Sequence, residues 1–349
     1  MIAVFDGHND FIQRVVAAGA DGPRLWLEGD GTGHMDLPRM RAGGVVGGFF
    51  AIWIPSPAGP NDAEAVALMQ NPPFRMPLPD PIPHDTALPH AFRQAAALKA
   101  LERTGTLDIA TDAAGLRRSI DSGRIAAIMH MEGAEPIRDM DALHLWHAMG
   151  LRSLGPVWSR PTVYAEGVPF AFPESPDIGG GLTDAGRDLV RECNALRIML
   201  DLSHLNEAGF NDVAALSDAP LVASHSCAHA ICPSTRNLTD RQLRVIADSG
   251  GLVGLNYASS FLREDGKRLP LEGFDTMLRH LDHLLSILGE NGVALGSDFD
   301  GALMPRDLQD ASAVPRLLQA MRDHGYDDAL IRKIACDNWI GVLERTWGA

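Results

Sequence analysis

Two side chains of the kind that bind metal ions stand near the N-terminus, His8 and Asp10 in the segment Asp6-Gly7-His8-Asn9-Asp10. Side chains at positions i and i+2 of a strand point to the same face, so this pair can bind one ion together. Imidazole with carboxylate suits zinc and related first-row divalent ions. Alone the pair is a weak signal, because a lone histidine is more often a satisfied core or surface residue.

Four more imidazole or carboxylate side chains stand at the ends of short apolar runs: Glu132, His204, His225 and Asp298. His204 and His225 add a second imidazole pair, and Glu132 is the candidate for a carboxylate between two ions. Two metal ions about 3.5–4 Å apart with a shared hydroxide are a standard hydrolytic arrangement. Asp298 is then placed to transfer protons to and from the water. Read singly, Glu132 would be a loop carboxylate and Asp298 a helix cap, so the prediction rests on the set.

The elements that must position these residues are short strands, most of them continuously apolar, as are strands buried on both faces of a parallel sheet. Eight runs are predicted as strands: 2–6, 45–54, 124–131, 151–157, 197–202, 219–224, 250–256 and 293–297. Helical patterns lie between them, at 91–104, 181–195, 238–249, 273–289 and 327–345. Thr239 and Asp240 form a plausible start for one of these helices.

This alternation predicts an α/β fold, specifically a (β/α)8 TIM barrel, whose active site lies at the C-terminal ends of the strands. No Gly-x-Gly-x-x-Gly follows the first strand, which removes the main reason to prefer a dinucleotide-binding sheet. We expect one domain over residues 1–349, because α/β barrels of this length are common as single domains. A proline-rich loop insertion is expected at 55–90 and a second long loop at 159–180.

The composition of the chain restricts the kinds of molecule that it can bind and the compartment in which we expect it. The formal net charge of −15 argues against a nucleic-acid partner, whose phosphates would require a basic face. The four cysteines form no Cys-x-x-Cys pair, which favours free thiols in a reducing compartment. No signal peptide and no run of 18 apolar residues is found, so we expect a cytoplasmic protein without a membrane partner. A homodimer stays open.

Six motifs in order resemble those of the membrane (renal) dipeptidase family, and they span residues 5–301. They are Phe5-Asp6-Gly7-His8-Asn9-Asp10, Met131-Glu132-Gly133, Asp201-Leu202-Ser203-His204, Ser224-His225-Ser226, Arg236-Asn237 and Gly296-Ser297-Asp298-Phe299-Asp300-Gly301. Any one motif is modest evidence, but six in register are strong evidence. The resemblance implies a binuclear zinc barrel of the metallo-dependent hydrolase type, within the amidohydrolase-like group. Without a signal or an anchor, only the bacterial cytoplasmic type fits.

The resemblance also implies roles for individual residues. Two zinc ions bridged by Glu132 would be bound by His8, Asp10, Glu132, His204 and His225. Asp298 matches the catalytic aspartate of the family. Arg236 matches the arginine that binds the substrate carboxylate, a task that suits a planar guanidinium.

The sequence departs from the family at the fourth predicted strand. Better-known animal members have a histidine there, whereas the matching position here is Trp158, which cannot carry a proton. Arg160 or Tyr164 could supply a hydrogen-bond donor instead. Asn237 and Tyr257 complete the predicted substrate-binding set with Arg236 and Trp158.

The function predicted from the sequence is a zinc-dependent dipeptidase that hydrolyses L-Xaa–L/D-Xaa dipeptides with a metal-bridging hydroxide. Glu132 and Asp298 are its predicted catalytic residues, and a small dipeptide-like molecule is its substrate. One alternative is another amidohydrolase, acting on N-acyl amino acids or lactams. An alternative from a different class is a non-catalytic metal-binding barrel. Asp298 argues against it, because a structural site is closed and needs no spare carboxylate.

Overall fold

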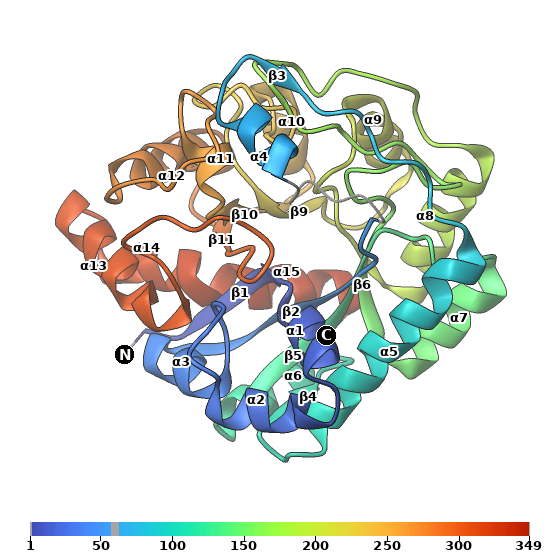
Figure 1. The fold of residues 1–349 in the computed structure, drawn as a ribbon, viewed down its shortest axis with the longest axis horizontal. Coiled ribbons are helices and arrows are strands. Elements are labelled where there is room, and N and C mark those ends of the chain that lie inside the picture. The colour runs from blue at the N-terminus through green and yellow to red at the C-terminus, as the bar shows by residue number, and fades with distance from the viewer. Residues whose placement is uncertain (1, 57–62, 349) are drawn as a thin grey trace.

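The computed structural model describes residues 2–56 and 63–348. Parallel strands lie at its centre and helices surround them (Figure 1). One sheet has the order β1-β2-β5-β6-β8, with β4 also paired to β5, and a second has the order β11-β10-β9. The strands are β1 (Val4–Asn9), β2 (Val45–Trp53), β4 (Leu107–Ile109), β5 (Ile125–Glu132), β6 (Leu151–Gly155), β8 (Met199–Leu200), β9 (Val222–Ser226), β10 (Leu252–Asn256) and β11 (Val293–Gly296). The predicted α/β class with parallel strands is therefore confirmed.

The two sheets are linked at both of their outer edges. An isolated parallel bridge joins Asp201, just after β8, to Val222 of β9. A second isolated parallel bridge joins Asn9 of β1 to Phe299, just after β11. The labelled parallel strands of both sheets, among them β1, β2, β6, β9 and β11, are arranged around one centre in Figure 1.

Each of the eight predicted apolar runs overlaps a strand, but several bounds were wrong. The first strand continues to Asn9 rather than ending at residue 6, so His8 lies within it. The run 197–202 contains only a two-residue strand, β8. The next residue, Asp201, still donates its N–H to the carbonyl of Leu154 in β6 and also forms the isolated bridge to β9. The three-residue strand β4 was missed, since so short a run has no readable periodicity.

Helices cover the outside of the strands. They are α1 (Phe11–Ala18), α2 (Gly22–Glu28), α3 (Leu37–Gly43), α4 (Ala63–Met69), α5 (His84–Glu102), α6 (Ala113–Asp121), α7 (Met140–Met149), α8 (Asp184–Leu196), α9 (Glu207–Leu216), α10 (Asp240–Asp248), α11 (Ser259–Leu262), α12 (Asp275–Leu288), α13 (Val314–His324), α14 (Asp328–Arg332) and α15 (Asn338–Trp347). Thr239 caps α10 as predicted, in a reciprocal capping box with Gln242. The single helix predicted at 327–345 is interrupted by a π-helical turn, Lys333–Asp337. None of the helices that the structure describes is long and apolar enough to span a membrane.

The segment 55–90, predicted as a loop, is partly regular. It contains α4, the strand β3 (Phe74–Arg75) and the first turns of α5, while its residues 57–62 lie outside the described part. β3 pairs antiparallel with β7 (Ala171–Phe172), which lies in the other predicted loop, 159–180. Proline is compatible with the position before a helix, as at Pro83, so proline content alone could not define a loop here.

Two parts of the apolar core involve the parallel strands, and a third, small cluster lies around β3 and β7. The larger part lies between the strands and the surrounding helices. The smaller part joins inward-facing residues from the N-terminal halves of strands in both sheets, such as Phe5 and Val222, to α15. Within it, Trp339 donates a hydrogen bond to the carbonyl of Leu295 in β11, at 2.9 Å. α15 therefore packs against the N-terminal ends of the strands, and the opposite ends remain for polar residues.

Candidate metal centre and substrate cavity

Four of the five predicted ligands converge on the fifth, Glu132, at the end of β5. Glu132 Oε1 lies 3.0 Å from His204 Nε2 and 3.4 Å from His225 Nε2. Its Oε2 lies 3.8 Å from His8 Nε2, which is 3.5 Å from Asp10 Oδ2. These residues form two buried groups, His8–Asp10–Glu132 and Glu132–His204–His225, whose donor atoms lie close enough together to hold a metal ion. The two groups share Glu132.

Local irregularities in two strands direct two of the histidines. β1 has one residue more than its partner β2 over residues 6–9, and β9 has one more than β10 over residues 223–226. Such β-bulges re-aim a side chain and are common next to active sites. His8 lies in the first bulge and His225 in the second.

Glycines on the neighbouring strands make room for the second bulge. A Cβ atom at Gly254 of β10 or at Gly296 of β11 would lie 2.0 Å from the carbonyl oxygen of Ser224. Only glycine tolerates so close an approach of backbone. The Gly-Ser-Asp motif at 296–298 therefore begins with glycine because of the strand that bears His225.

Backbone conformation is also unusual at this end of the strands. His204, Asp298 and Asp300 have positive φ angles of 68°, 60° and 65°. Such conformations are uncommon for residues other than glycine and persist only where the surrounding structure enforces them. Here each turns the chain sharply at a strand end and presents an imidazole or carboxylate.

Burial keeps two of the imidazoles neutral. It lowers the pKa of both His204 and His225 well below the usual range, and the nearby positive charges of Arg236 and His8 add to this effect. A neutral imidazole retains the lone pair that a metal ion needs. Burial also raises the pKa of Glu132 well above its usual value, although the charge of His8 opposes this.

His8 behaves in the opposite way. Burial would lower its pKa, but the charges of Glu132 and Asp10 outweigh burial and raise the pKa to about 10. The carboxylates thus create a strong preference for positive charge at this point, which a divalent ion would meet as well as a proton. Both ring nitrogens of His8 are buried and make no hydrogen bond among the described residues. Such orphaned polar atoms are costly, so a metal ion at Nε2 fits the site.

Serine hydroxyls contact the far side of two rings. Ser159 Oγ lies 2.8 Å from His204 Nδ1, and Ser224 Oγ lies 2.8 Å from His225 Nδ1. A hydrogen bond at one ring nitrogen orients the ring and leaves the other nitrogen for a metal ion. Ser159 was not identified from the sequence, because an isolated serine in a loop gives no signal.

Asp298 follows β11 and lies beside the metal groups. Its backbone N–H donates to the carbonyl of His8 at 2.9 Å, and its Oδ2 accepts from Asn256 Nδ2 at 2.9 Å. Burial raises the pKa of Asp298, with Asp10 adding to the effect and His8 opposing it. Asn256 was missed in the sequence, although it ends the predicted strand 250–256, a strand end to which no functional side chain was assigned.

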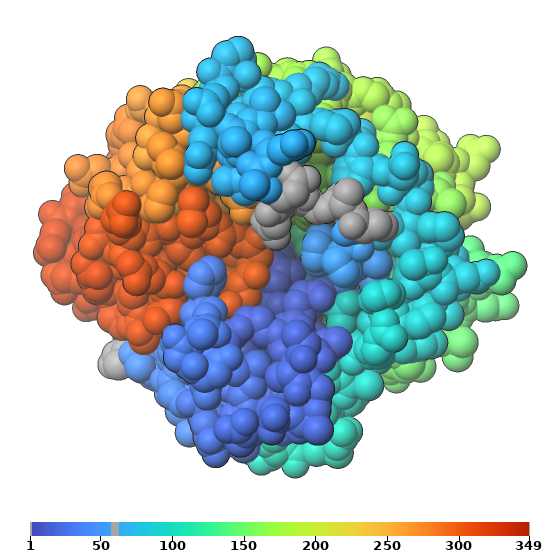
Figure 2. All heavy atoms as spheres, viewed as in Figure 1, coloured from blue at the N-terminus to red at the C-terminus, as the bar shows by residue number. Residues whose placement is uncertain are grey.

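A cavity of about 370 Å³ opens next to these groups. Figure 2 shows that the same face of the molecule is hollowed near its centre, between the dark-blue N-terminal segment and the orange-red segment that follows β11. The cavity is lined by Asp10, Gln13, Trp53, Pro55, Ser56, Met69, Glu132, Trp158, Phe170, His204, Ala258, Ser260, Phe261, Arg268, Asp298, Asp300, Gly301, Ala302 and Leu303.

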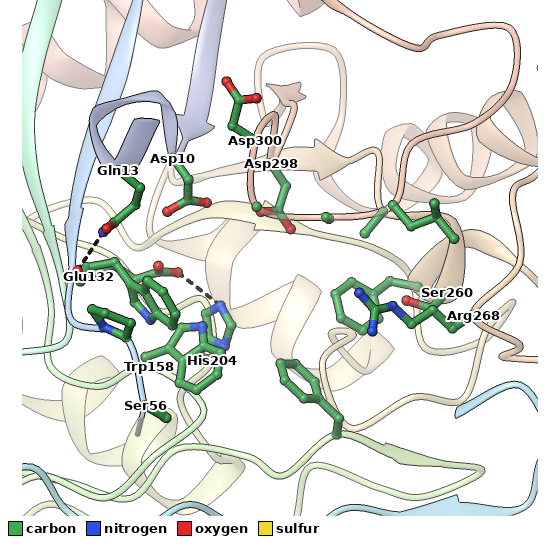
Figure 3. Close-up of a pocket in the computed structure, with 18 of the residues that line it drawn as sticks. Asp10, Gln13, Ser56, Glu132, Trp158, His204, Ser260, Arg268, Asp298 and Asp300 are labelled. Carbon is green, nitrogen blue, oxygen red and sulfur yellow. Dashed lines mark hydrogen bonds and ion pairs between the residues drawn. The ribbon is translucent and has the colours of Figure 1, made fainter. Parts of the chain in front are cut away.

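The two sides of the cavity differ in chemistry. Asp10 and Asp298 lie on one side, with Trp158 and His204 across from them (Figure 3). Trp158 belongs to an aromatic row, with its ring centre 5.2 Å from that of Trp53 and 5.7 Å from that of Phe170. The cavity thus combines carboxylates with a broad apolar surface, as small-molecule sites commonly do.

Trp158 lines this cavity, but the two residues suggested as alternative donors do not. Arg160 is fully buried and forms an ion pair with Glu135 at 2.6 Å. Tyr164 is buried and donates its hydroxyl to the carbonyl of Ile137. Arg160 also donates to Ser56 Oγ on the cavity lining, at 2.7 Å, but neither Arg160 nor Tyr164 is itself a lining residue. A hydrogen bond from either one to substrate stays a prediction.

Three other predicted substrate-binding residues lie behind the lining. Arg236 donates to the carbonyl of His225 at 3.0 Å and to Ser226 Oγ at 3.3 Å, and its buried Nε makes no hydrogen bond among the described residues. Asn237 holds the carbonyls of Cys232 and Phe261.

Tyr257 packs edge-on against Phe299. Direct contact of Arg236, Asn237 and Tyr257 with substrate stays a prediction. The lining residues that were not foreseen include Phe261, whose ring lies 5.4 Å from the Arg236 guanidinium, and Arg268.

Comparisons with known proteins found a matching family profile and several similar proteins. The profile of the membrane dipeptidase family, peptidase family M19, matches residues 1–347. A metallopeptidase from Rhodobacter sphaeroides, solved with a phosphinate mimic of the dipeptide L-Ala-D-Ala, is 58% identical, with a TM-score of 0.97 over 99% of each chain. Dipeptidase AC, a metallopeptidase of family M19, is also 58% identical, with a TM-score of 0.96 over 100% of this chain and 99% of its own. An uncharacterised protein from the pqqA 5′ region of Klebsiella pneumoniae is 45% identical over 73% of this chain and 96% of its own length.

Proposed function

Because this chain belongs to the membrane dipeptidase family, peptidase family M19, and is a metallo-dipeptidase of that family, we propose that it hydrolyses L-Xaa–L/D-Xaa dipeptides with the help of zinc. The observation that supports this best is the pair of buried groups, His8–Asp10–Glu132 and Glu132–His204–His225, that share one carboxylate.

Two zinc ions per chain suit these donors. Imidazole and carboxylate are zinc ligands, and a carboxylate with one oxygen near each group can bridge two ions. When bound, the ions supply a water molecule of lowered pKa and polarise the carbonyl of the scissile peptide bond.

Asp298 is the proposed proton carrier. Asn256 holds its Oδ2, and the carboxylate lies on the cavity surface beside Asp10. Asp298 takes a proton as the attacking water loses one of its O–H bonds. It then delivers that proton to the amine nitrogen as the C–N bond breaks.

The substrate is proposed from the cavity and from a relative. About 370 Å³ is at the small end of ligand pockets, which suits a dipeptide. The Rhodobacter sphaeroides relative was solved with a mimic of L-Ala-D-Ala, so a D-residue at the second position is proposed to be accepted. Trp158 offers an apolar face to the substrate. Arg236 is the proposed partner of its C-terminal carboxylate, supported by Asn237 and Tyr257.

We also infer that the two sheets belong to one barrel within one domain. The bridges at both outer edges of the sheets support one closed (β/α)8 barrel, and inward residues of both sheets share one apolar cluster. A single domain over residues 1–349 follows from it. The four free, buried cysteines are consistent with a cytoplasmic location, and a homodimer remains a proposal to test.

A substrate panel tests the function. Purified protein with added zinc should hydrolyse a library of L,L and L,D dipeptides, and Asp298→Asn, prepared in parallel, should not. N-acyl amino acids and lactams belong in the same panel. Turnover of those compounds alone would replace the dipeptidase with another amidohydrolase. Metal binding without hydrolysis of any member would support a non-catalytic barrel.

A further inference from the structure

One buried carboxylate of the strand-end motifs has no role in the reaction described above. Asp201, just after β8, is 1% exposed. Its Oδ1 accepts hydrogen bonds from the backbone N–H groups of Ser203 and Ser224, at 3.0 and 2.8 Å. Its Oδ2 accepts from the hydroxyl of Ser224 at 2.5 Å. Asp201 thus holds the bulged part of β9 across the edge where the two sheets meet.

The same hydroxyl touches a predicted metal ligand. Ser224 Oγ lies 2.8 Å from His225 Nδ1. A hydroxyl has one proton to donate. Because the Asp201 carboxylate can only accept, that proton points to Asp201, and the oxygen of Ser224 accepts the N–H of His225 Nδ1. The lone pair of His225 then resides on Nε2, which faces Glu132 Oε1 at 3.4 Å.

The surroundings keep Asp201 in the accepting form. Burial raises its pKa, whereas the hydrogen bonds from Ser224 and Ser203 lower it. Because burial also lowers the pKa of His130 to about 4, the accepting form of Asp201 depends on these hydrogen bonds rather than on a charge at His130. His130 Nε2 lies 3.6 Å from Asp201 Oδ2. A carboxylate that orients a metal-binding histidine is a recurrent arrangement in metal sites, and here the carboxylate would act through a serine.

We propose that Asp201 and Ser224 are positioning residues, which fix the tautomer and the orientation of His225 for a metal ion. The proposal rests on the proposed function in one respect, the assignment of His225 as a ligand. A competing role for Asp201 is direct ligation, since His8, Asp201 and His225 also form a group with closely spaced donor atoms. The hydrogen bonds that both oxygens of Asp201 already accept favour positioning over ligation.

The chain provides a matched control. Ser153 Oγ lies 2.8 Å from His130 Nδ1, the same distance as in the Ser224–His225 pair, and both pairs are buried. His130 belongs to neither of the groups proposed to bind zinc. Ser153→Ala therefore removes an equivalent serine–histidine hydrogen bond without touching a proposed ligand.

The first experiment measures metal binding by the metal-free protein. Wild type, Ser224→Ala and Ser153→Ala are titrated with Co²⁺, and the visible spectrum reports the coordination of each ion. Loss of a partner that orients a ligand typically weakens metal binding about 10–100-fold. We expect that loss for one of two ions in Ser224→Ala, with a changed cobalt spectrum, and wild-type behaviour in Ser153→Ala. Wild-type affinities and spectrum in Ser224→Ala would overturn the proposal.

Asp201→Asn tests whether Asp201 sets the direction of the hydrogen bonds to His225 or only holds β9 in place. The amide nitrogen of asparagine can donate to Ser224 Oγ, whose proton would then turn to His225 Nδ1. His225 would carry its own proton on Nε2 and could not bind an ion there. Asp201→Asn should therefore weaken the same ion more than Ser224→Ala does. A weaker effect of Asp201→Asn than of Ser224→Ala contradicts the direction of the hydrogen bonds.

Two further measurements keep the test decisive. If Ser224→Ala does not fold, the tautomer of His225 can be read from ¹⁵N NMR of the zinc-loaded wild type, with the signal assigned by its absence in His225→Gln. Protonated Nδ1 supports the proposal and protonated Nε2 overturns it. His225→Ala distinguishes the two levels of inference: if it retains both ions, the proposed function fails, whereas if it loses one and Ser224→Ala loses none, only the positioning role fails.

Discussion

The two ends of the same strands are built for different purposes. At the N-terminal ends, Phe5, Ile128 and Val222 pack with α15 in a wholly apolar cluster. A few residues further along the same strands stand His8, Glu132 and His225. This end has two bulges, three positive φ angles outside glycine and orphaned ring nitrogens.

The comparison indicates that the residues that stabilise the fold and the residues that perform chemistry lie at opposite ends of the strands, as is usual in barrels. The apolar end gains free energy from burial. The polar end has accumulated features that are individually costly, such as buried carboxylates with raised pKa values at Glu132 and Asp298. A bound metal ion would offset part of that cost. Substitutions at the polar ends of the strands should therefore reduce activity, whereas substitutions at the apolar ends should reduce stability.

Removal of metal is expected to have the largest effect. A chelator should abolish dipeptide hydrolysis, because the site then lacks the groups that activate water and carbonyl. Far-UV circular dichroism should change little, since the apolar end does not depend on metal. Re-addition of zinc to about two ions per chain, measured by elemental analysis, should restore turnover. Full activity after exhaustive removal would contradict the mechanism.

Asp298→Asn is expected to have the second-largest effect on activity. The amide cannot carry the proton, so kcat should fall roughly 10²–10⁴-fold while the metal content stays at the wild-type level. Steady-state kinetics with elemental analysis of the same sample checks both statements. Near-normal turnover would mean that Asp298 only holds the turn after β11.

Leu343→Ala probes the other end. Leu343 of α15 is completely buried in the smaller apolar cluster. Its truncation should lower the free energy of unfolding by about 2–5 kcal/mol. The kcat/KM of the folded enzyme should stay near that of wild type. Chemical denaturation and kinetics on one preparation measure the two quantities, and a large loss of activity without loss of stability would break the separation of the two ends.

The fold class and most strand positions could be predicted because short, continuously apolar runs and helical periodicity are local signals. The capping box at Thr239 is an example, since it depends on residues only three positions apart. The pairing of β3 with β7 could not be predicted in this way. It joins segments about a hundred residues apart, each with only two residues in the strand.

The site shows the same division. Spacing in the sequence indicated which imidazoles and carboxylates would meet, because parallel strands deliver their C-terminal ends to one side. It could not indicate that Asn256 holds Asp298, or that Ser159 orients His204, since these contacts depend on side-chain geometry. Nor could it show that Arg160 is paired with Glu135 rather than facing the cavity.

Arg236 tests the boundary between the two kinds of residue, because it is buried next to the polar ends of the strands. It is 3% exposed, bound to the carbonyl of His225, and covered by the ring of Phe261. Arg268, by contrast, lines the cavity. Both arginines are therefore candidates for the substrate carboxylate, and matched variants can separate them.

If Arg236 binds that carboxylate, Arg236→Met should lower kcat/KM for free dipeptides by the equivalent of about 1.5–3 kcal/mol, the range for a hydrogen bond to a charged group. For dipeptide amides, which lack the charge, the same substitution should cost little. The two perturbations would then be non-additive, as expected for partners in one contact. Arg268→Met, measured on the same four combinations, is the control and should give additive penalties. If the penalties of Arg236→Met and amidation simply add while those of Arg268→Met do not, the carboxylate is bound at the cavity surface. The buried arginine then belongs with the residues that support His225 rather than with those that touch substrate.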